Sequence, residues 1–307
     1  MKKYIGITLL HGAWDRVVKS SVSQAGIPGS SPGGATKKFL SYMKKFELPY
    51  NFNNDYFAFL THYKEYFKYI KFIYMPAFKE GGIQNTRENS GILEKENYTD
   101  YTKYSEIIKR FQSLDLDVCI LIQRNATLEI VKKYIDEFNI KYFVINDDTL
   151  AKTLKELYGD KIYVILSITR RITYNEIMKK DFSMYDEICL DFWFNRHIDK
   201  IKKLPTKYKY SILINSVCCP FCPKKESEIH WYQDHWHTCL PKDSIEIFPA
   251  DLIYFDPYIT SFKCIDRTFT STEILNSFKD YVKAYENKDN PDPRRGVEDY
   301  YNIKLKG

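Results

Sequence analysis

The sequence predicts a closed (β/α)8 barrel, a TIM-like α/β fold, preceded by a short N-terminal extension. From residue 46 onward, short apolar runs alternate with amphipathic stretches in seven or eight consecutive units, without a break in composition. Such alternation is typical of parallel strands joined by helices. No glycine-rich dinucleotide fingerprint follows the first strand-like run, and its absence from the sequence disfavours an open doubly wound sheet.

The expected strands are short and apolar. Residues 118–122 read Val-Cys-Ile-Leu-Ile, a continuous apolar run that indicates a strand buried on both faces. The expected strands are 46–52, 71–76, 118–122, 142–145, 162–168, 187–192 and 210–215, with two further short runs at 251–255 and 261–265.

The expected helices lie between these runs and begin after residues that cap helix N-termini well. Asn53, Asn54 and Asp55, for example, precede a helix that reaches about Tyr69. The later helices are expected at 101–114, 127–138, 148–158, 173–180, 196–203 and 271–285.

The chain divides into three parts by composition. Residues 1–45 form an N-terminal extension with a loop rich in Gly, Ser and Pro, and residues 46–286 form the barrel, with a Cys-rich insertion at 216–240. Residues 287–307 are a C-terminal tail.

Composition limits the class of protein. The 307 residues carry a net charge of +6, which permits a nucleic-acid partner without requiring one. No apolar run reaches the length of a membrane span, and no secretory segment opens the sequence, so we expect a cytoplasmic protein.

Four of the seven cysteines lie in one short segment that directly follows the run at 210–215. Cys218 or Cys219, together with Cys222, gives a closely spaced pair of thiols, and Cys239 can supply a third. Cys264 is a candidate for the fourth. Thiolates in that number suit an iron–sulfur cluster.

The same segment holds half of the six histidines, and these keep other interpretations open. Substitution of His230, His235 or His237 for one or two of the thiols would suit structural zinc. A disulfide is disfavoured because we expect a reducing compartment. Buried thiols that serve packing alone are the remaining alternative.

A barrel also predicts where substrate would bind, because reactive groups lie at the carboxyl ends of its strands. Arginine and amide side chains recur at those ends, and they recognise carboxylate, phosphate or a nucleobase edge by hydrogen bonds. Helix capping is the alternative role for each Asn. The candidate substrate-binding residues are Arg124, Arg170, Asn195, Arg196 and Asn215.

Three stretches together resemble a known family. The first is a strand followed in order by Asn215, Cys218, Cys222-Pro, basic residues, His230 and later Cys239. The others are residues 191–196, where an Asn-Arg pair opens a helix, and residues 259–268 with Phe-Lys and a later Arg. Together they resemble the collagenase-like peptidase family U-32, in particular its short single-barrel relatives, over about residues 46–285.

The resemblance implies a barrel that carries a [4Fe–4S] cluster on Cys218, Cys222, Cys239 and Cys264, with Cys219 as a substitute. It also implies an enzyme that hydroxylates a nucleobase or a small aromatic substrate without oxygen. Asp266 stands where the family's closing motif has glycine, which leaves the reaction less secure than the cluster. The alternative is a zinc-stabilised barrel that binds RNA or protein without catalysis, since the chain is rich in lysine and tyrosine.

Overall fold

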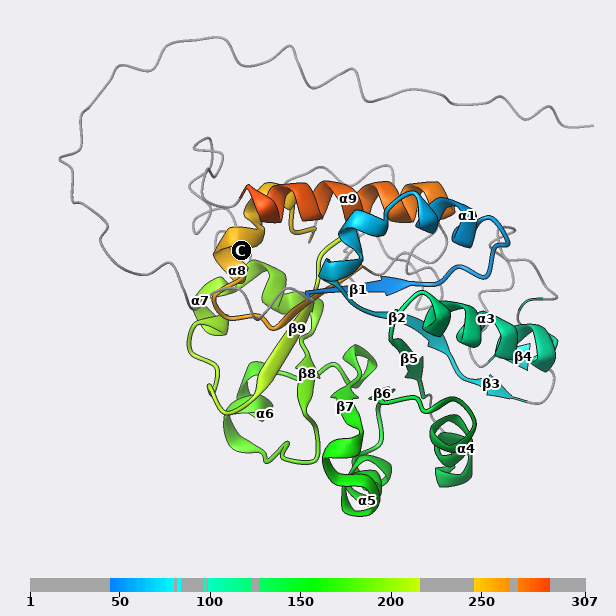
Figure 1. The fold of residues 1–307 in the computed structure, drawn as a ribbon. Helices are drawn as coiled ribbons and strands as arrows, with labels where there is room; N and C mark the ends of the chain where they lie inside the picture. Colours follow the sequence, from blue (N-terminus) through cyan, green and yellow to red (C-terminus); the bar gives the residue numbers. More distant parts are fainter. Residues whose placement is uncertain are drawn as a thin grey trace, which may run out of the picture. The chain divides into compact units, whose positions relative to one another are not determined.

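The computed structural model describes residues 45–79, 82–83, 97, 99–122, 127–215, 246–264 and 270–287. Within these residues, eight parallel strands close into a barrel in the order β1-β10-β9-β8-β7-β6-β5-β2. The predicted fold class is therefore confirmed. Figure 1 shows the strands surrounded by helices. The barrel strands are β1 (Phe46–Pro49), β2 (Ile70–Pro76), β5 (Val118–Leu121), β6 (Tyr142–Ile145), β7 (Tyr163–Leu166), β8 (Glu187–Cys189), β9 (Lys209–Leu213) and β10 (Ser261–Lys263).

The helices that follow the strands begin at capping side chains. Asp147 accepts a hydrogen bond from the backbone N–H of Leu150 at 2.9 Å, and Thr173 and Thr270 each form a capping box. The α-helices are α1 (Tyr56–Thr61), α3 (Tyr101–Ser113), α4 (Leu128–Phe138), α5 (Asp148–Tyr158), α6 (Tyr174–Lys179), α7 (Ile198–Ile201), α8 (Leu252–Phe255) and α9 (Ser271–Glu286). The 3₁₀ helices are η1 (Lys64–Tyr69), η3 (Gly159–Lys161), η4 (Ile168–Arg170), η5 (Phe192–Arg196) and η7 (Pro249–Asp251).

Some predicted elements differ from the structure. The strands expected at 162–168 and 187–192 are shorter, because 3₁₀ turns follow β7 and β8 directly. Within the apolar run at 251–255, residues 252–255 form helix α8, and the run at 261–265 supplies the closing strand β10. A small antiparallel pair, β3 (Phe78–Lys79) and β4 (Gly82–Ile83), was not predicted.

Two apolar clusters fill the described part of the molecule. The larger lies between strands and helices, and includes Phe46, Ile212 and Cys264 from strands or strand ends together with Phe278 from α9. The smaller contains only residues from strands and from the turns after them, so it lies inside the barrel. Its buried members are Phe72, Tyr74, Cys119, Val144, Ile165, Cys189, Phe192 and Leu213.

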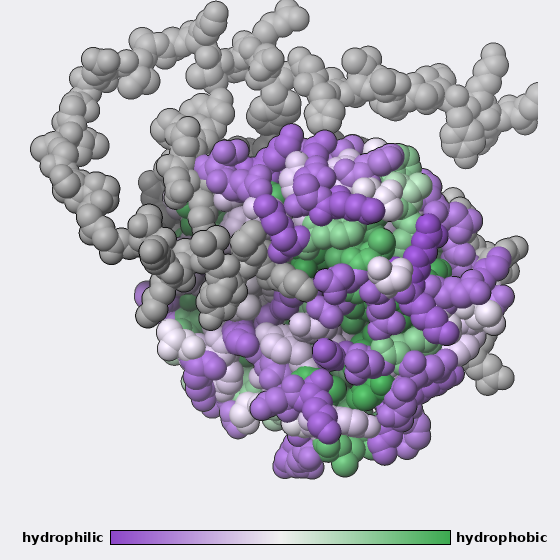
Figure 2. Space-filling model, in the orientation of Figure 1, coloured by the Kyte–Doolittle hydropathy of each residue, from purple (hydrophilic) through white to green (hydrophobic). Residues whose placement is uncertain are grey.

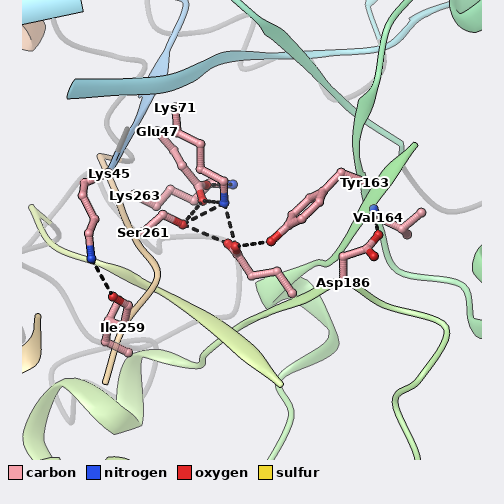
Figure 3. A network of polar contacts seen from close by, with 10 residues as sticks. Lys45, Glu47, Lys71, Tyr163, Val164, Asp186, Ile259, Ser261 and Lys263 are labelled. Carbon is pink, nitrogen blue, oxygen red and sulfur yellow. Dashed lines mark hydrogen bonds and ion pairs between the residues drawn. The ribbon is translucent and has the colours of Figure 1, made fainter. Parts of the chain in front are cut away.

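The barrel interior also contains a charged network, drawn in Figure 3. Lys71 Nζ donates to Glu187 Oε2 at 2.6 Å and to Ser261 Oγ at 3.0 Å, and lies 3.4 Å from Glu47 Oε1. Lys263 Nζ lies 3.7 Å from Glu47 Oε2. Both glutamates are fully buried. The interior therefore holds two cations opposite two carboxylates.

The network is kept charged by its own members. Burial opposes ionisation of Glu187, but the Lys71 ammonium and hydrogen bonds from Lys71, Ser261 and Tyr163 outweigh burial, so the pKa of Glu187 is lowered. Burial likewise opposes the charge on Lys71, and Glu187 and Glu47 outweigh it, so the pKa of Lys71 is raised. A shift in register between β1 and β2 lies beside Lys71, and this irregularity allows both Lys71 and Phe72 to face inward.

The surface around the barrel is mainly polar. Figure 2 shows hydrophilic residues over most of one face, with apolar residues reaching the surface near its centre. None of the described helices combines the length and apolar character needed to cross a bilayer.

Candidate functional site

The carboxyl ends of β7, β8 and β9 supply the described polar groups that best fit a functional site. A 3₁₀ turn follows each of β7 and β8, and the three strands are neighbours in the barrel. Side chains from these turns can therefore meet at one edge. Of the candidate residues, Arg124 and the four thiols Cys218, Cys219, Cys222 and Cys239 lie outside the described residues.

Arg170, at the end of η4, makes a two-pronged ion pair. Its guanidinium donates to both oxygens of Asp148, at 3.1 Å and 2.8 Å, and Tyr185 donates to the same carboxylate at 2.8 Å. The Asp148 hydrogen bond is the main reason that the pKa of Arg170 is raised. In the described structure Arg170 therefore ties the turn after β7 to helix α5.

Asn195 and Arg196 belong to η5, after β8, and both are buried. Asn195 Nδ2 donates to the carbonyl of Leu213 on β9 at 2.7 Å. The Arg196 guanidinium donates to the carbonyl of Glu246 at 3.4 Å. These two side chains link the turn after β8 to both ends of the segment that contains the clustered thiols.

Those two ends meet at the barrel. The backbone N–H of Ile247 donates to the carbonyl of Ile214 at 2.9 Å, and Tyr281 OH lies 2.7 Å from the carbonyl of Ile247 and 3.3 Å from that of Ile214. Asn215 follows Ile214 directly, so its backbone lies next to this closure, which Asn195 and Arg196 also contact through Leu213 and Glu246. Burial raises the pKa of Glu246 to about 7, although the attraction of Arg196 and a hydrogen bond with Tyr281 oppose the shift.

Cys264 is the one predicted metal ligand that the structure describes. It follows β10, where Ser261 and Lys263 face the barrel interior, so alternation along the strand turns Cys264 outward. It is buried in the cluster between strands and helices, and burial raises the pKa of its thiol well above the usual range. Among the described residues, no group of three or more His, Cys, Asp or Glu side chains could hold a metal ion.

A pocket of about 480 Å³ lies between the turns after β7 and β8. Its wall includes the aromatic rings of Tyr174, Trp193 and Phe194 and the apolar side chain of Ile172. The other lining residues are polar or charged: Arg171, Thr173, Asn175, Asp191 and Lys200.

Asp191 is the buried acid of this pocket, with 6% of its surface exposed. Its Oδ1 accepts a hydrogen bond from the backbone N–H of Trp193 at 2.9 Å. Burial raises the pKa of Asp191, while that hydrogen bond and the nearby charge of Arg171 pull it down. An acid in such a setting can accept a hydrogen bond from a ligand, or donate one when protonated.

Two rigid features shape the pocket wall. The Trp193 ring stacks on His197, with centroids 3.6 Å apart, and the His197 ring nitrogen Nδ1 lies 2.7 Å from the Trp193 carbonyl. Arg171 has a left-handed backbone with φ 50°, which L side chains rarely adopt. The candidate set included Arg170 but not Arg171, because adjacent arginines after a strand cannot be told apart by pattern.

Comparison with known proteins gives a likeness of fold. No family model and no curated protein matches the chain. Among solved structures, the chain is similar to the U32 peptidase Mk0906, with 12% identity over 62% of this chain and 74% of that one, and a TM-score of 0.44. The likeness concerns the path of the chain, and the chemistry of the site rests on its own residues.

Proposed function

We propose that the protein is an iron–sulfur-dependent barrel enzyme. Its cluster would be held by the Cys-rich insertion at residues 216–240, called here the thiol segment, which follows the carboxyl end of β9. The supporting observation is the closure at the base of that segment. Ile214 and Ile247 are joined at 2.9 Å, and Arg196 and Tyr281 bond to main-chain carbonyls at the same closure. The described residues on either side of the thiol segment therefore meet at the end of the barrel where such folds bind their substrates.

The position of Cys264 bears on the choice of the fourth ligand. Its outward direction and its place among apolar side chains do not fit a ligand shared with the thiol segment. We therefore propose Cys218, Cys222 and Cys239, with Cys219 in the place of Cys264. When bound, a cluster with all its irons held by protein carries electrons, whereas one with an open iron can bind substrate.

The substrate would approach from the same end of the barrel. Asn215 directly precedes the thiol segment, and the pocket beside Asp191 lies between the turns after β7 and β8. The U-32 resemblance implies oxygen-independent hydroxylation of a nucleobase or a small aromatic substrate. Arg170 and Arg196 would act in this proposal by holding the turns that frame the substrate.

The test is metal analysis and visible absorption of protein purified without oxygen. We expect a brown protein with about four irons per chain, and loss of both colour and iron in Cys222→Ser. Cys264→Ala is the matched control, because its thiol packs in the outer core and the variant should keep its iron. A colourless protein with one zinc would favour the zinc-stabilised binding module instead. Full iron content in Cys222→Ser would refute the assigned ligands.

A further inference from the structure

We infer that the pocket between the turns after β7 and β8 binds a planar ring that carries a hydrogen-bond donor on its edge and an anionic substituent. The ring would lie against Trp193 and Tyr174, the donor would meet Asp191, and the anion would meet Arg171 and Lys200. None of these residues belongs to the thiol segment. The inference deepens the proposed function, because it names the chemistry of the ligand that the pocket beside Asp191 would take.

The size and lining of the pocket indicate a small ligand. A volume of about 480 Å³ falls in the range of sites for cofactors and metabolites. Such sites are mainly apolar, with a few polar groups that fix orientation. Here the apolar part is aromatic, and flat rings stack favourably on aromatic side chains.

The wall is prepared for stacking before any ligand arrives. His197 covers the Trp193 ring, and Phe194 packs edge-on against Trp193 with centroids 5.2 Å apart. Tyr174 is held at the start of α6 by the capping box of Thr173 and Glu176. A rigid wall lowers the entropy lost on binding.

The polar side chains that line the pocket are of two kinds, one buried carboxyl and two cations. Asp191 is buried, with its Oδ1 bonded to the Trp193 backbone, and a carboxyl so placed favours a ligand that offers a donor. Arg171 is exposed, and Lys200 lies 5.5 Å from the centroid of the Tyr174 ring. Both side chains line the pocket, and two cations there favour a carboxylate or a phosphate.

The backbone of Arg171 gives a second line of support. A residue other than glycine is strained at φ 50°, and such strain is concentrated at functional sites. Glycine would adopt this conformation more easily, yet the chain has arginine here. The side chain is therefore the feature that we expect to serve the pocket.

Two sources of such a ligand can be separated by binding measurements on the full chain. The probes are AMP and GMP for nucleotides and 2-aminobenzoate for aromatic carboxylates. Ribose 5-phosphate lacks the aromatic ring, and benzoate lacks the edge donor. We expect at least one of AMP, GMP and 2-aminobenzoate to bind with a Kd below about 1 mM. The control is ribose 5-phosphate for the nucleotides and benzoate for 2-aminobenzoate, and it should bind at least about tenfold more weakly than its probe.

Three variants assign the site. Arg171→Gly relieves the strained backbone, so it should fold normally while it weakens binding about 10- to 100-fold, the effect of losing a charge-assisted hydrogen bond. Trp193→Ala removes a stacking ring and should weaken binding at least about tenfold. If Trp193→Ala does not fold, Tyr174→Ala is measured in its place, with the same expected loss of binding. Lys152→Ala, an exposed cation on α5, is the matched control and should bind like the wild type.

The same measurement on Cys222→Ser separates this inference from the proposed function. Ring binding should persist in that variant whether or not it holds iron. The inference is overturned if none of the three donor probes binds, if ribose 5-phosphate binds as well as AMP, or if folded Arg171→Gly binds like the wild type.

Discussion

Replacement of Lys71 by methionine tests whether the barrel interior is ionised. Methionine has similar length and fits irregular gaps, so packing changes little. The ammonium contacts Glu187, Glu47 and Ser261 at 2.6–3.4 Å, and both glutamates are fully buried. Its removal leaves two carboxylates opposite Lys263 alone.

The expected cost is large. Removal of one partner from a buried ion pair costs about 3–5 kcal/mol, because the other charge stays buried without compensation. For a domain of this size, each kcal/mol lowers the Tm by about 2–4 °C, so Lys71→Met should lower it by about 6–20 °C. The double variant Lys71→Met/Glu187→Gln restores neutrality, with Glu47 facing Lys263, and should recover at least half of the loss. Lys152→Met, in a surface pair with 70% and 63% exposed side chains, should cost less than about 1 kcal/mol.

The pH dependence gives the sharper test. In the wild type the pKa of Glu187 is lowered, so its contribution to stability is present above the unfolded pKa and is lost as pH falls through the folded pKa. Without Lys71, burial dominates and the pKa of Glu187 rises. The variant should then gain stability, relative to wild type, as pH falls from 8 toward 5. Urea unfolding followed by circular dichroism at both pH values measures this. A cost below about 1 kcal/mol, with the same pH slope as wild type, would refute a charged network.

Three further predictions concern the turns at the carboxyl end. Tyr281→Phe removes a hydroxyl that bonds to main-chain carbonyls at the base of the thiol segment, and should cost about 1–3 kcal/mol in urea unfolding. Asp148→Asn breaks a half-exposed pair with Arg170 and should cost less than about 1 kcal/mol by the same assay; a larger cost would mean that this pair holds the turn after β7 more firmly than its exposure implies. Burial lowers the pKa of His197, so its contribution to stability is lost as pH falls from the unfolded value of about 6.5 through the folded pKa. Trp193 fluorescence, obtained by difference from Trp193→Phe, should change with a midpoint below 6.5, and a midpoint above it would contradict the lowered pKa.

Strong local signals made part of the fold predictable. Residues 142–145 and 148–158 match a strand and a helix end to end, because an apolar run is followed by Asp147, which caps the helix. The turns η4 and η5 gave no such signal. They are single 3₁₀ turns, three and five residues long, whose geometry depends on contacts with neighbouring strands.

The charged network was hidden from the sequence for a different reason. Lys71 and Glu187 are 116 residues apart, and Ser261 lies 190 residues from Lys71, so no local pattern joins them. Each reads as an ordinary polar position in a short strand. Only closure of the barrel makes them neighbours.

That network also explains why the direction of the Cys264 side chain could not be predicted from the sequence. Residues 261–264 read Ser, Phe, Lys, Cys, an alternation of polar and apolar side chains. A barrel strand is buried on both faces, and the pattern does not say which face lies inside. In most barrels apolar side chains fill the interior, and that rule would turn Phe262 and Cys264 inward. Here Ser261 and Lys263 complete the charged interior, so the thiol must face the helices. The inward positions of Ser261 and Lys263, which build the network, therefore also fix the outward direction of Cys264.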